Sequence, residues 1–434
     1  MTDELEDLGR GFRARTLVTA RLATKIGARA VRRTLLGAGK ATADDEGSAK
    51  RARDLVTQLG SLKGLVMKLG QVASYMPGAM PPAAQKVLAE LQAASTPMAY
   101  EKISAVLRAE LGDEPTSLFD EFSPTPIAAA SIGQVHRARF QGRAVAIKVQ
   151  YPGIEQVMAS DLDTVGLIAR VSTLGGAIDG KALAAELRTR TLEECDYRLE
   201  AKNQHAFAAM LAGDPDARVP AVIEARSARR VLTSELVEGQ SFAAFAENAP
   251  AEERNRAGTT IFRVCFDSIF RRCAYNADPH PGNYLFEPGG RVAFLDFGCV
   301  RRFDPPMIDA WKAVALAVLD DDQATFRRRF PDLGMVADAK RFDWDHQWQV
   351  MRYLYRPFSE RPFMTYTDEY VRQSYGLLLF DNPNARRTAC PPAWLYLNRL
   401  QWGLNSVLAQ LRATGPWPDL WRAAVESKTE PWAG

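Results

Sequence analysis

One stretch of this 434-residue chain constrains its fold more than any other. It is residues 273–298, CAYNADPHPGNYLFEPGGRVAFLDFG. It holds an Asp-x-x-x-x-Asn loop from Asp278 to Asn283 and, 13 residues later, the Asp-Phe-Gly that begins at Asp296. Residues alternate in character on either side of the turn sequence 287–290, which predicts a short β-hairpin between the two motifs. We expect the hairpin to bring Asn283 and Asp296 close enough to share a metal ion, and their oxygen atoms suit Mg²⁺.

This order of motifs is typical of a protein-kinase catalytic loop followed by its metal-binding aspartate. In that interpretation Asp278 orients the acceptor group, while Asn283 and Asp296 hold the metal ion. Each motif alone is a weak signal, because Pro- and Gly-rich turns and the tripeptide Asp-Phe-Gly also occur by chance. The rest of the chain has to decide whether this is a phosphoryl-transfer site.

Residues 124–149 predict a hairpin and a strand that would cover a nucleotide. Four small residues form the expected turn, namely Ala128, Ala129, Ala130 and Ser131. A strand then carries Lys148, which in kinases contacts phosphates. Ala and Ser in place of Gly permit backbone contact with phosphate but stiffen the loop. A core strand with an exposed lysine is the alternative; the position 130 residues before Asp278 favours the phosphate role.

Residues 181–212 predict a single helix that is rich in acidic side chains. Asp196 and Glu200 are four residues apart, so they would share one helical face. An active kinase pairs one helix acid with the strand lysine. For Glu193 we prefer the interpretation of an ordinary surface acid.

Residues 219–223 and 230–237 are expected to be strands that close an N-terminal lobe. Glu235 and Val237 would lie in the hinge, where backbone atoms bond the adenine edge. A helix at 252–275 leads into the catalytic loop. Only five residues separate Gly298 from Asp304, where Asp followed by Pro indicates the start of a helix. That leaves no room for a long activation segment, so we expect no platform for docking a peptide.

The N-terminal part of the chain is basic and helical in pattern. Residues 9–43 carry nine Lys or Arg and no acid, so the other residues sum to +3 − 9 = −6. A helix at 10–38 would either adsorb to an anionic membrane surface or pack on the protein itself, and both readings stay open. A second helix, at 49–75, contains Lys68 and Gln71, which periodicity alone places at the surface.

Composition indicates a globular protein of a reducing compartment. The chain has 47% hydrophobic residues, four scattered His and five Cys without zinc-binding spacing. We find no run of about 20 apolar residues and no secretory signal, so we expect a soluble, cytoplasmic protein. We expect Cys195, Cys273 and Cys299 to be buried structural thiols, and His280 to support its loop by hydrogen bonds.

Together these motifs resemble the UbiB/ABC1/ADCK (AarF-type) family of atypical kinases, from about residue 51 to about residue 411. Four features in order carry the resemblance: Lys68-Leu69-Gly70-Gln71 (KxGQ), the alanine-rich loop 128–131, Glu194-Cys195-Asp196 (ExD), and ADPHPGN at 277–283. The resemblance implies an α+β, protein-kinase-like two-lobe fold. It has a small antiparallel N-lobe sheet, a helical C-lobe and an N-terminal helical extension over the active site.

The resemblance also implies roles for individual residues. Lys68, Gly70 and Gln71 would occupy the space of a protein substrate, Glu194 and Asp196 would meet that extension, and Glu200 would pair with Lys148. The expected domains are a basic segment with its linker at 1–48, the helical extension at 49–114, the N-lobe at 115–237 and the C-lobe at 238–434.

By the same resemblance the cofactors are ATP and Mg²⁺, and the activity is a kinase or ATPase linked to ubiquinone or prenyl-lipid metabolism. Expected partners are ATP, anionic membrane lipids and quinone-like or prenyl-lipid small molecules, without nucleic acid or a protein substrate; any membrane contact would be peripheral. The chain has Asn276 where the family usually has His. This departure puts the loop's usual internal hydrogen bond in doubt, but not the metal ligands.

Two alternative functions remain. One is a nucleotide-gated lipid-binding or scaffold pseudokinase without physiological phosphotransfer. The other is a small-molecule kinase of the aminoglycoside or choline type, which leaves residues 68–71 and 194–196 unexplained.

Overall fold

The computed structural model describes residues 98–130, 132–156, 158, 189, 192–360, 363–380, 382–384, 387–389 and 391–432. The chain divides into two compact units, Met1–Thr96 with Gly153–Leu192 and Pro97–Pro152 with Glu193–Gly434. Nearly all described residues belong to the second unit. The basic helix expected at 10–38 and the motif with Lys68, Gly70 and Gln71 lie outside the described residues.

In the described residues the N-terminal lobe is built on a four-stranded antiparallel sheet. Its strands, in spatial order, are β1 (Glu121–Ala129), β2 (Gly133–Phe140), β3 (Arg143–Gln150) and β5 (Val231–Glu235). Val145, Ile147 and Val149 alternate on β3 and are fully buried, so Lys148 projects from the opposite face. The sheet therefore presents its lysine away from its own hydrophobic core.

Helix α5 (Tyr100–Leu111) covers the buried face of this sheet. Ile103 and Leu107 join the hydrophobic cluster of Val145 and Ile147. Glu110 fixes the helix to the far end of the sheet by a 2.7 Å ion pair with Arg230. Residues 100–111, expected to end the helical extension, thus contribute to the core of the N-terminal lobe together with α6 (Pro115–Leu118).

The long helix predicted across 181–212 is interrupted at Cys195 and Asp196. Helix α9 begins only at Tyr197 and ends at Met210, and Asp196 precedes it in an extended conformation. The Asp196 carboxylate accepts a hydrogen bond from the Arg198 amide at 3.1 Å, because a short acidic side chain can satisfy an orphan amide of the first turn. The prediction that Asp196 and Glu200 share a helical face was wrong.

Two other boundaries also differ from the prediction. The strand expected at 219–223 is reduced to an isolated bridge between Val222 and Ser234, and the neighbouring β4 (Ala217–Arg218) pairs instead with β9. The helix expected at 252–275 is α11 (Ala251–Arg272). Cys273 ends it in a left-handed conformation, with φ of 51°. The residues that follow form strand β7 (Ala274–Asn276), which pairs with β10 (Val300–Arg302).

The catalytic-loop hairpin has the predicted form. Strands β8 (Tyr284–Glu287) and β9 (Arg291–Phe294) are antiparallel, and they belong to a sheet of order β4-β9-β8-β6 that includes β6 (Gln240–Ser241). Asp304 precedes α12 (Pro305–Leu319), which has proline in its first turn as predicted.

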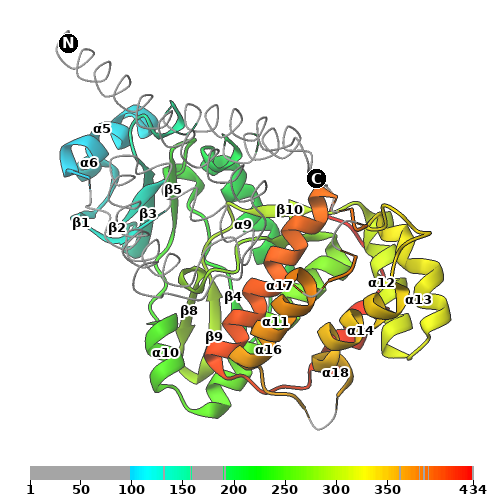
Figure 1. Ribbon diagram of the computed structural model, residues 1–434. Coiled ribbons are helices and arrows are strands. Elements are labelled where there is room, and N and C mark those ends of the chain that lie inside the picture. The colour runs from blue at the N-terminus through cyan, green and yellow to red at the C-terminus, as the bar shows by residue number, and fades with distance from the viewer. Residues whose placement is uncertain are drawn as a thin grey trace, which may run out of the picture. The chain divides into compact units, whose positions relative to one another are not determined.

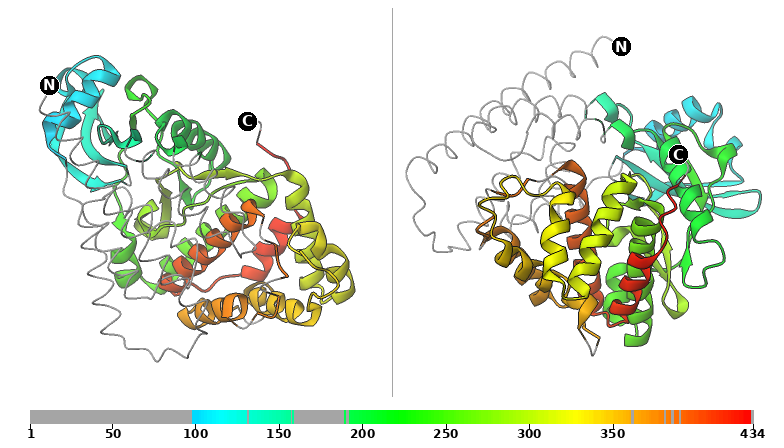
Figure 2. Two further views of the ribbon diagram at one scale, coloured as in Figure 1. Left: turned by 45° about the horizontal axis from the view of Figure 1, so that its top comes forward. Right: turned by 90° about the vertical axis from the view of Figure 1, so that its right-hand side faces the viewer.

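The C-terminal lobe is helical (Figures 1 and 2). Its further helices are α10 (Phe242–Asn248), α13 (Gln323–Arg329), α14 (Trp344–Leu354), α15 (Arg356–Ser359), α16 (Asp368–Tyr375), α17 (Pro392–Leu411) and α18 (Trp417–Glu426). Three phenylalanines at four-residue steps on α11, including Phe266, face α18, and the Phe266 ring lies 4.4 Å from that of Trp421. This aromatic core holds α11, which leads into the catalytic loop.

Within the described residues, no helix combines the length and the apolar character needed to cross a membrane.

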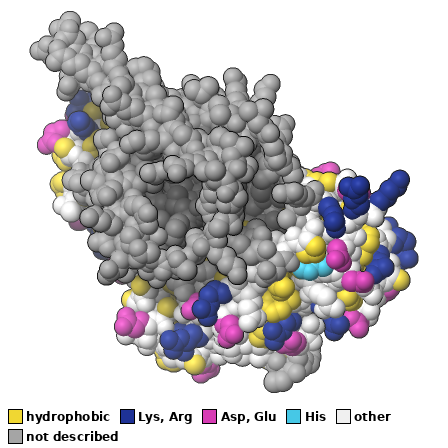
Figure 3. All heavy atoms as spheres, in the orientation of Figure 1, with side chains coloured by type: hydrophobic (Ala, Val, Ile, Leu, Met, Phe, Trp, Pro, Cys, Tyr) yellow, Lys and Arg dark blue, Asp and Glu magenta, His cyan; other side chains and the backbone are white. Residues whose placement is uncertain are grey.

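On the face that Figure 3 shows, the described Lys and Arg side chains lie interspersed with Asp and Glu side chains over the helical lobe.

Candidate active site

Lys148 is the centre of a cluster that joins three elements. Its Nζ atom lies 2.8 and 2.9 Å from the two carboxylate oxygens of Glu200 on α9, and 3.2 Å from Oδ2 of Asp296 after β9. The side chains of Lys148 and Glu200 are 15% and 4% exposed, whereas that of Asp296 is 32% exposed. The cluster is therefore open to solvent on the side of Asp296.

The surroundings shift the pKa of each member. Burial raises the pKa of Glu200 to about 7, against the opposing charge of Lys148. Burial also acts to raise the pKa of Asp296, but the Lys148 charge and the Gly298 amide outweigh it and lower that pKa. For Lys148, the two carboxylates outweigh burial and raise its pKa well above the usual value. At neutral pH the lysine and Asp296 are charged, and Glu200 is the member that titrates.

One face of α9 holds the Asp-Phe-Gly segment. Glu200 accepts a hydrogen bond from the Phe297 amide, and Asn203 Nδ2 donates to the Phe297 carbonyl at 3.1 Å. The Phe207 ring lies 5.0 Å from the buried Phe297 ring. Positions 200, 203 and 207 recur at helical spacing, so a rotation of α9 would disturb the lysine pair and the Asp-Phe-Gly together.

The catalytic loop is held largely by bonds within itself. Asn283 Nδ2 donates to the Asp278 carbonyl at 2.9 Å, and the Leu295 amide donates to the Asn283 carbonyl at 3.0 Å. These bonds place Asn283 and the residue before Asp296 at the same end of the hairpin. His280 Nδ1 accepts a hydrogen bond from the Gly282 amide at 3.0 Å, which confirms its predicted supporting role.

Asn276 connects the loop to the Asp-Phe-Gly segment. Its Nδ2 donates to the Asp296 carbonyl, and its Oδ1 accepts from the Asp278 amide at 3.2 Å. The loop therefore keeps an internal hydrogen bond although Asn replaces the usual His.

The donor atoms at Asn283 and Asp296 fit a magnesium ion. The bonds to Asp278 orient the Asn283 amide nitrogen toward the loop, which leaves its oxygen for a cation, and Asp296 supplies a carboxylate. Mg²⁺ needs only one or two protein ligands when phosphate oxygens and water complete its coordination. Across the part of the chain that the structure describes, no three or more His, Cys, Asp or Glu side chains gather in metal-binding geometry.

The expected nucleotide-covering residues lie in a tight turn. Ala128 and Ala129 end β1, and Ala130 exchanges backbone hydrogen bonds with Gly133 at 2.9 and 3.5 Å. A Cβ atom at Gly133 would lie 2.1 Å from the Val149 carbonyl, so the turn requires glycine at this position. Ser131 lies outside the described residues.

The expected hinge follows β5. The Glu235 amide donates to the Ala221 carbonyl at 2.9 Å, and its side chain lies 3.5 Å from Arg218. Val237 is buried, and its amide has no hydrogen bond within the described ranges. Of the two predicted hinge residues, Val237 is thus the one with a backbone donor to offer.

The ExD motif lies at the start of α9. Asp196 accepts two hydrogen bonds from the Arg198 guanidinium, and these bonds lower the pKa of that carboxyl. Glu193, expected to be a surface acid, has a side chain that is 38% exposed, and it lies 3.9 Å from the buried guanidinium of Arg301. Whether Glu194 and Asp196 meet the KxGQ helix stays a prediction.

Several residues of the site have no motif and were not predicted. The Tyr197 ring lies 5.0 Å below Lys148 Nζ, and its buried hydroxyl has no partner among the described residues. Gly403 on α17 faces the catalytic loop, where a Cβ atom would lie 2.1 Å from Cγ of Pro279. A glycine inside an apolar helix was the available signal for this close approach. The three cysteines predicted to be buried, Cys195, Cys273 and Cys299, are buried.

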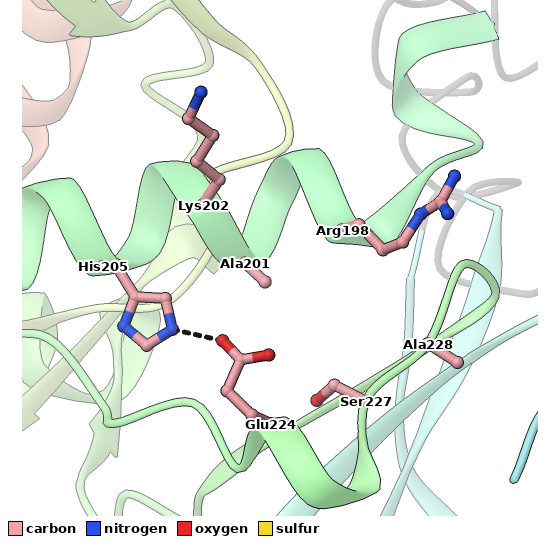
Figure 4. A pocket seen from close by; sticks show the side chains of 7 residues that line it. All are labelled: Arg198, Ala201, Lys202, His205, Glu224, Ser227 and Ala228. Carbon is pink, nitrogen blue, oxygen red and sulfur yellow. Dashed lines mark hydrogen bonds and ion pairs between the residues drawn. The ribbon is translucent and has the colours of Figure 1, made fainter. Parts of the chain in front are cut away.

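The opposite face of α9 lines a surface hollow of about 310 Å³ (Figure 4). Arg198, Lys202 and His205 border it from the helix, and His205 contacts Glu224 at 2.5 Å. These positions are about half a turn away from Glu200 and Phe207, so the hollow is separate from the lysine cluster.

Comparison with known proteins agrees with this geometry. The model of the ABC1 atypical kinase-like domain matches residues 90–329, more than half of the chain. The rat mitochondrial atypical kinase COQ8B is 32% identical over 318 residues, which cover 71% of this chain and 59% of the rat protein. The mitochondrial atypical kinase COQ8 of Saccharomyces cerevisiae is 30% identical over 278 residues, covering 63% of this chain and 55% of the yeast protein. The chain thus spans less than two thirds of the length of these curated relatives.

A solved structure shares the fold across most of the chain. The complex of Rv3197 with erythromycin, from Mycobacterium tuberculosis, has a TM-score of 0.66 and 30% sequence identity. The match covers 90% of this chain and 100% of that one. The predicted α+β, protein-kinase-like fold is confirmed, and the chain belongs to the ABC1 (UbiB/ADCK, AarF-type) family of atypical kinases.

Proposed function

We propose that the protein binds ATP with Mg²⁺ and acts as an atypical kinase or ATPase. The observation that carries this proposal is the single lysine bonded to carboxylates from two other elements. Lys148 comes from the upper sheet, Glu200 from α9 and Asp296 from the segment below. A structural ion pair needs only two partners, whereas a phosphate site needs a cation and a metal ligand side by side.

In this proposal each residue has a separate task. Glu200 holds the Lys148 ammonium so that it reaches the α- and β-phosphates. Asn283 and Asp296 would hold Mg²⁺, which when bound neutralises charge on the phosphate oxygens. Asp278 orients a hydroxyl group or a water molecule toward the terminal phosphate. Positioning and charge neutralisation, rather than covalent chemistry by the protein, account for the rate.

The nucleotide would be covered and bounded by backbone. The turn with Ala128, Ala129, Ala130 and Ser131 would lie over the phosphates. The hinge around Glu235 and Val237 would bond the adenine edge, and the Val237 amide is the available donor. Because alanine side chains keep the turn backbone stiffer than glycine would, we expect modest nucleotide affinity.

Access to the acceptor site would be restricted by the KxGQ motif. In this proposal Lys68, Gly70 and Gln71 occupy the place of a protein substrate, and Glu194 and Asp196 hold them there. The acceptor would then be water or a small quinone-like or prenyl-lipid molecule, by analogy with the ubiquinone link of the family. The basic segment 10–38 would bring the protein to an anionic membrane surface.

A nucleotide-gated scaffold without phosphotransfer is the second candidate. Three features favour it: the alanine-rich turn at 128–131, Asn276 in the catalytic loop, and the short segment from Gly298 to α12, which leaves no room for a substrate platform. A scaffold needs only the binding half of the site, which these features leave intact.

Asp296→Asn tests the proposal directly. The change keeps the shape of the side chain but removes the charge that faces Lys148 and the metal ion. We expect Mg²⁺-dependent ATP binding or turnover to be abolished, measured by calorimetry and phosphate release. Unchanged turnover in this variant would refute the assignment.

Liposomes separate the two candidates. Turnover of the wild-type protein that rises with anionic liposomes and a quinone-like phenol supports a lipid-linked ATPase. ATP binding with no turnover under all these conditions supports the scaffold.

A further inference from the structure

The chain beyond α18 forms an extended strap, residues 427–432, that is tied to two helices of the C-terminal lobe. Lys312 on α12 donates to the Ser427 carbonyl and to Thr429 Oγ1, both at 2.7 Å. Thr429 Oγ1 in turn donates to Asp309 on α12 at 2.9 Å. These contacts fix the first half of the strap on α12.

The second half of the strap completes the end of α11. The Glu430 and Trp432 amides donate to the carbonyls of Arg271 and Arg272, at 2.6 and 3.2 Å. The last carbonyls of a helix lack partners within that helix, so the strap supplies bonds that the helix end requires. The Glu430 carboxylate adds an ion pair with Arg272 at 3.3 Å.

The strap ends on the helix that carries the lysine's partner. The Trp432 ring packs edge-on against Phe207 of α9, with 4.8 Å between ring centroids. Phe207 contacts Phe297 of the Asp-Phe-Gly segment at 5.0 Å. Figure 2 shows the red C-terminal segment running from the helical lobe toward the green part of the chain that includes α9. Three aromatic rings thus lead from the strap to the active site.

We propose that this strap is a clamp on α9 and that Trp432 is a positioning residue for Glu200. Arg198 and Lys202 on the polar face of α9 border the surface hollow, so packing on the opposite face of the helix contributes strongly to fixing its rotation. Glu200 lies two helical turns before Phe207 on that packed face. Removing the Trp432 ring frees the Phe207 end, and the loosened helix then holds Lys148 less firmly.

The effect on nucleotide binding rests on the proposed function, whereas the effect on α9 does not. Loss of the interaction between one pair of aromatic rings corresponds to about a fivefold change in a binding constant. We therefore expect Trp432→Ala to weaken binding of Mg²⁺ and ATP about fivefold. A tail that merely packs on the surface would change overall stability without a specific change in α9.

The test compares Trp432→Ala with Trp344→Ala in the full-length chain. Trp344 is also partly buried and contacts Phe342 at 4.8 Å, but it lies on α14 and not against α9. Amide hydrogen exchange of residues 197–210 and affinity for Mg²⁺ with ATP are measured for both variants and for Trp432→Phe. We expect faster exchange in α9 and weaker binding for Trp432→Ala alone, and near wild-type values for Trp432→Phe.

The clamp proposal is wrong if amide hydrogen exchange in α9 is unchanged in Trp432→Ala. It is also wrong if Trp344→Ala speeds exchange in α9 by the same amount. Wild-type protein that binds no ATP refutes the proposed function, while the exchange result still decides the clamp. If Trp432→Ala does not fold, Trp432→Leu, which removes the ring but keeps apolar bulk, is judged by the same two outcomes.

Discussion

The upper and lower halves of the active site are held in different ways. In the upper half, Lys148 and Glu200 are largely buried and balance each other's charge, with Asp296 as a third partner. In the lower half, Asp278 and Asn283 lie in a half-buried loop whose hydrogen bonds run mainly between its own residues and Asn276. Close packing of small residues, such as Gly403 beneath Pro279, supports that loop from below.

Because the two halves are held differently, different kinds of substitution should disturb them. A buried charge is stable only while its partner is present, so the upper half is sensitive to charge and to pH. The lower half depends on backbone shape, so it is sensitive to added volume and to lost turn bonds. We therefore expect changes above to affect nucleotide binding first, and changes below to affect turnover first.

The largest effect is expected for Lys148→Met. It removes the cation and leaves two carboxylates facing each other, which costs about 3 kcal/mol of stability when a buried pair loses one partner. The variant should bind no ATP. Its stability deficit should shrink as pH falls, because the buried Glu200, already of raised pKa, then takes up a proton that relieves its uncompensated charge. Urea unfolding at pH 8 and at pH 5.5 measures this; equal deficits at both pH values contradict the account.

Gly403→Ala should affect the lower half alone. The added methyl group collides with Pro279 and displaces the catalytic loop, and a shift of about 1 Å is enough to cost about 100-fold in turnover. Affinity for ATP measured without Mg²⁺ should stay near that of the wild type, because Asn283 in the displaced loop would contact only the metal ion. Gly376→Ala is the matched control, since a Cβ atom there meets no atom within 4 Å. A Gly403→Ala variant that loses affinity and turnover equally would show that the halves are not separable.

A smaller and graded effect is expected from pH. Burial raises the pKa of Glu200 to about 7, so the carboxylate is protonated as pH falls below that value and no longer holds Lys148. The value of kcat/KM should therefore decline on the acid side of pH 7, by about tenfold per pH unit. In Glu200→Gln, kcat/KM should be lower than in the wild type and should not decline on the acid side of pH 7. An identical decline in the variant would assign it to another group.

The smallest effect is expected for Asn276→Ala. It removes two hydrogen bonds that join the loop to the Asp-Phe-Gly segment, and the loss should lower turnover about fivefold. Asn276→His, which restores the residue usual in the family, should recover most of the rate. A steady-state assay of both variants at saturating ATP provides the comparison. Wild-type turnover in Asn276→Ala would show that the two hydrogen bonds of Asn276 do not matter for catalysis.

Patterns local to one segment predicted much of the site. The turn at 287–290 predicted β8 and β9 because turn preferences and alternation are properties of neighbouring residues. The strand predicted to carry Lys148 is β3, where Lys148 projects from the face opposite Val145 and Ile147. Family resemblance, rather than periodicity, singled out Glu200 as its partner.

Contacts between distant segments could not be predicted in this way. The helix breaks at Asp196 because Gln150 bonds the Cys195 carbonyl at 2.9 Å and the Tyr197 amide bonds the Arg229 carbonyl at 2.8 Å. Asp favours both a cap and a solvated helix position, and only these tertiary bonds select the cap. The packing of Trp432 on Phe207 has no local signal either.

The most direct test of the central claim is a crystal structure with Mg²⁺ and a non-hydrolysable ATP analogue. The account predicts Lys148 Nζ within about 3.2 Å of α- or β-phosphate oxygens, and one Mg²⁺ bound by both Asn283 and Asp296. A nucleotide bound away from Lys148, or a metal ion that touches neither residue, would contradict it.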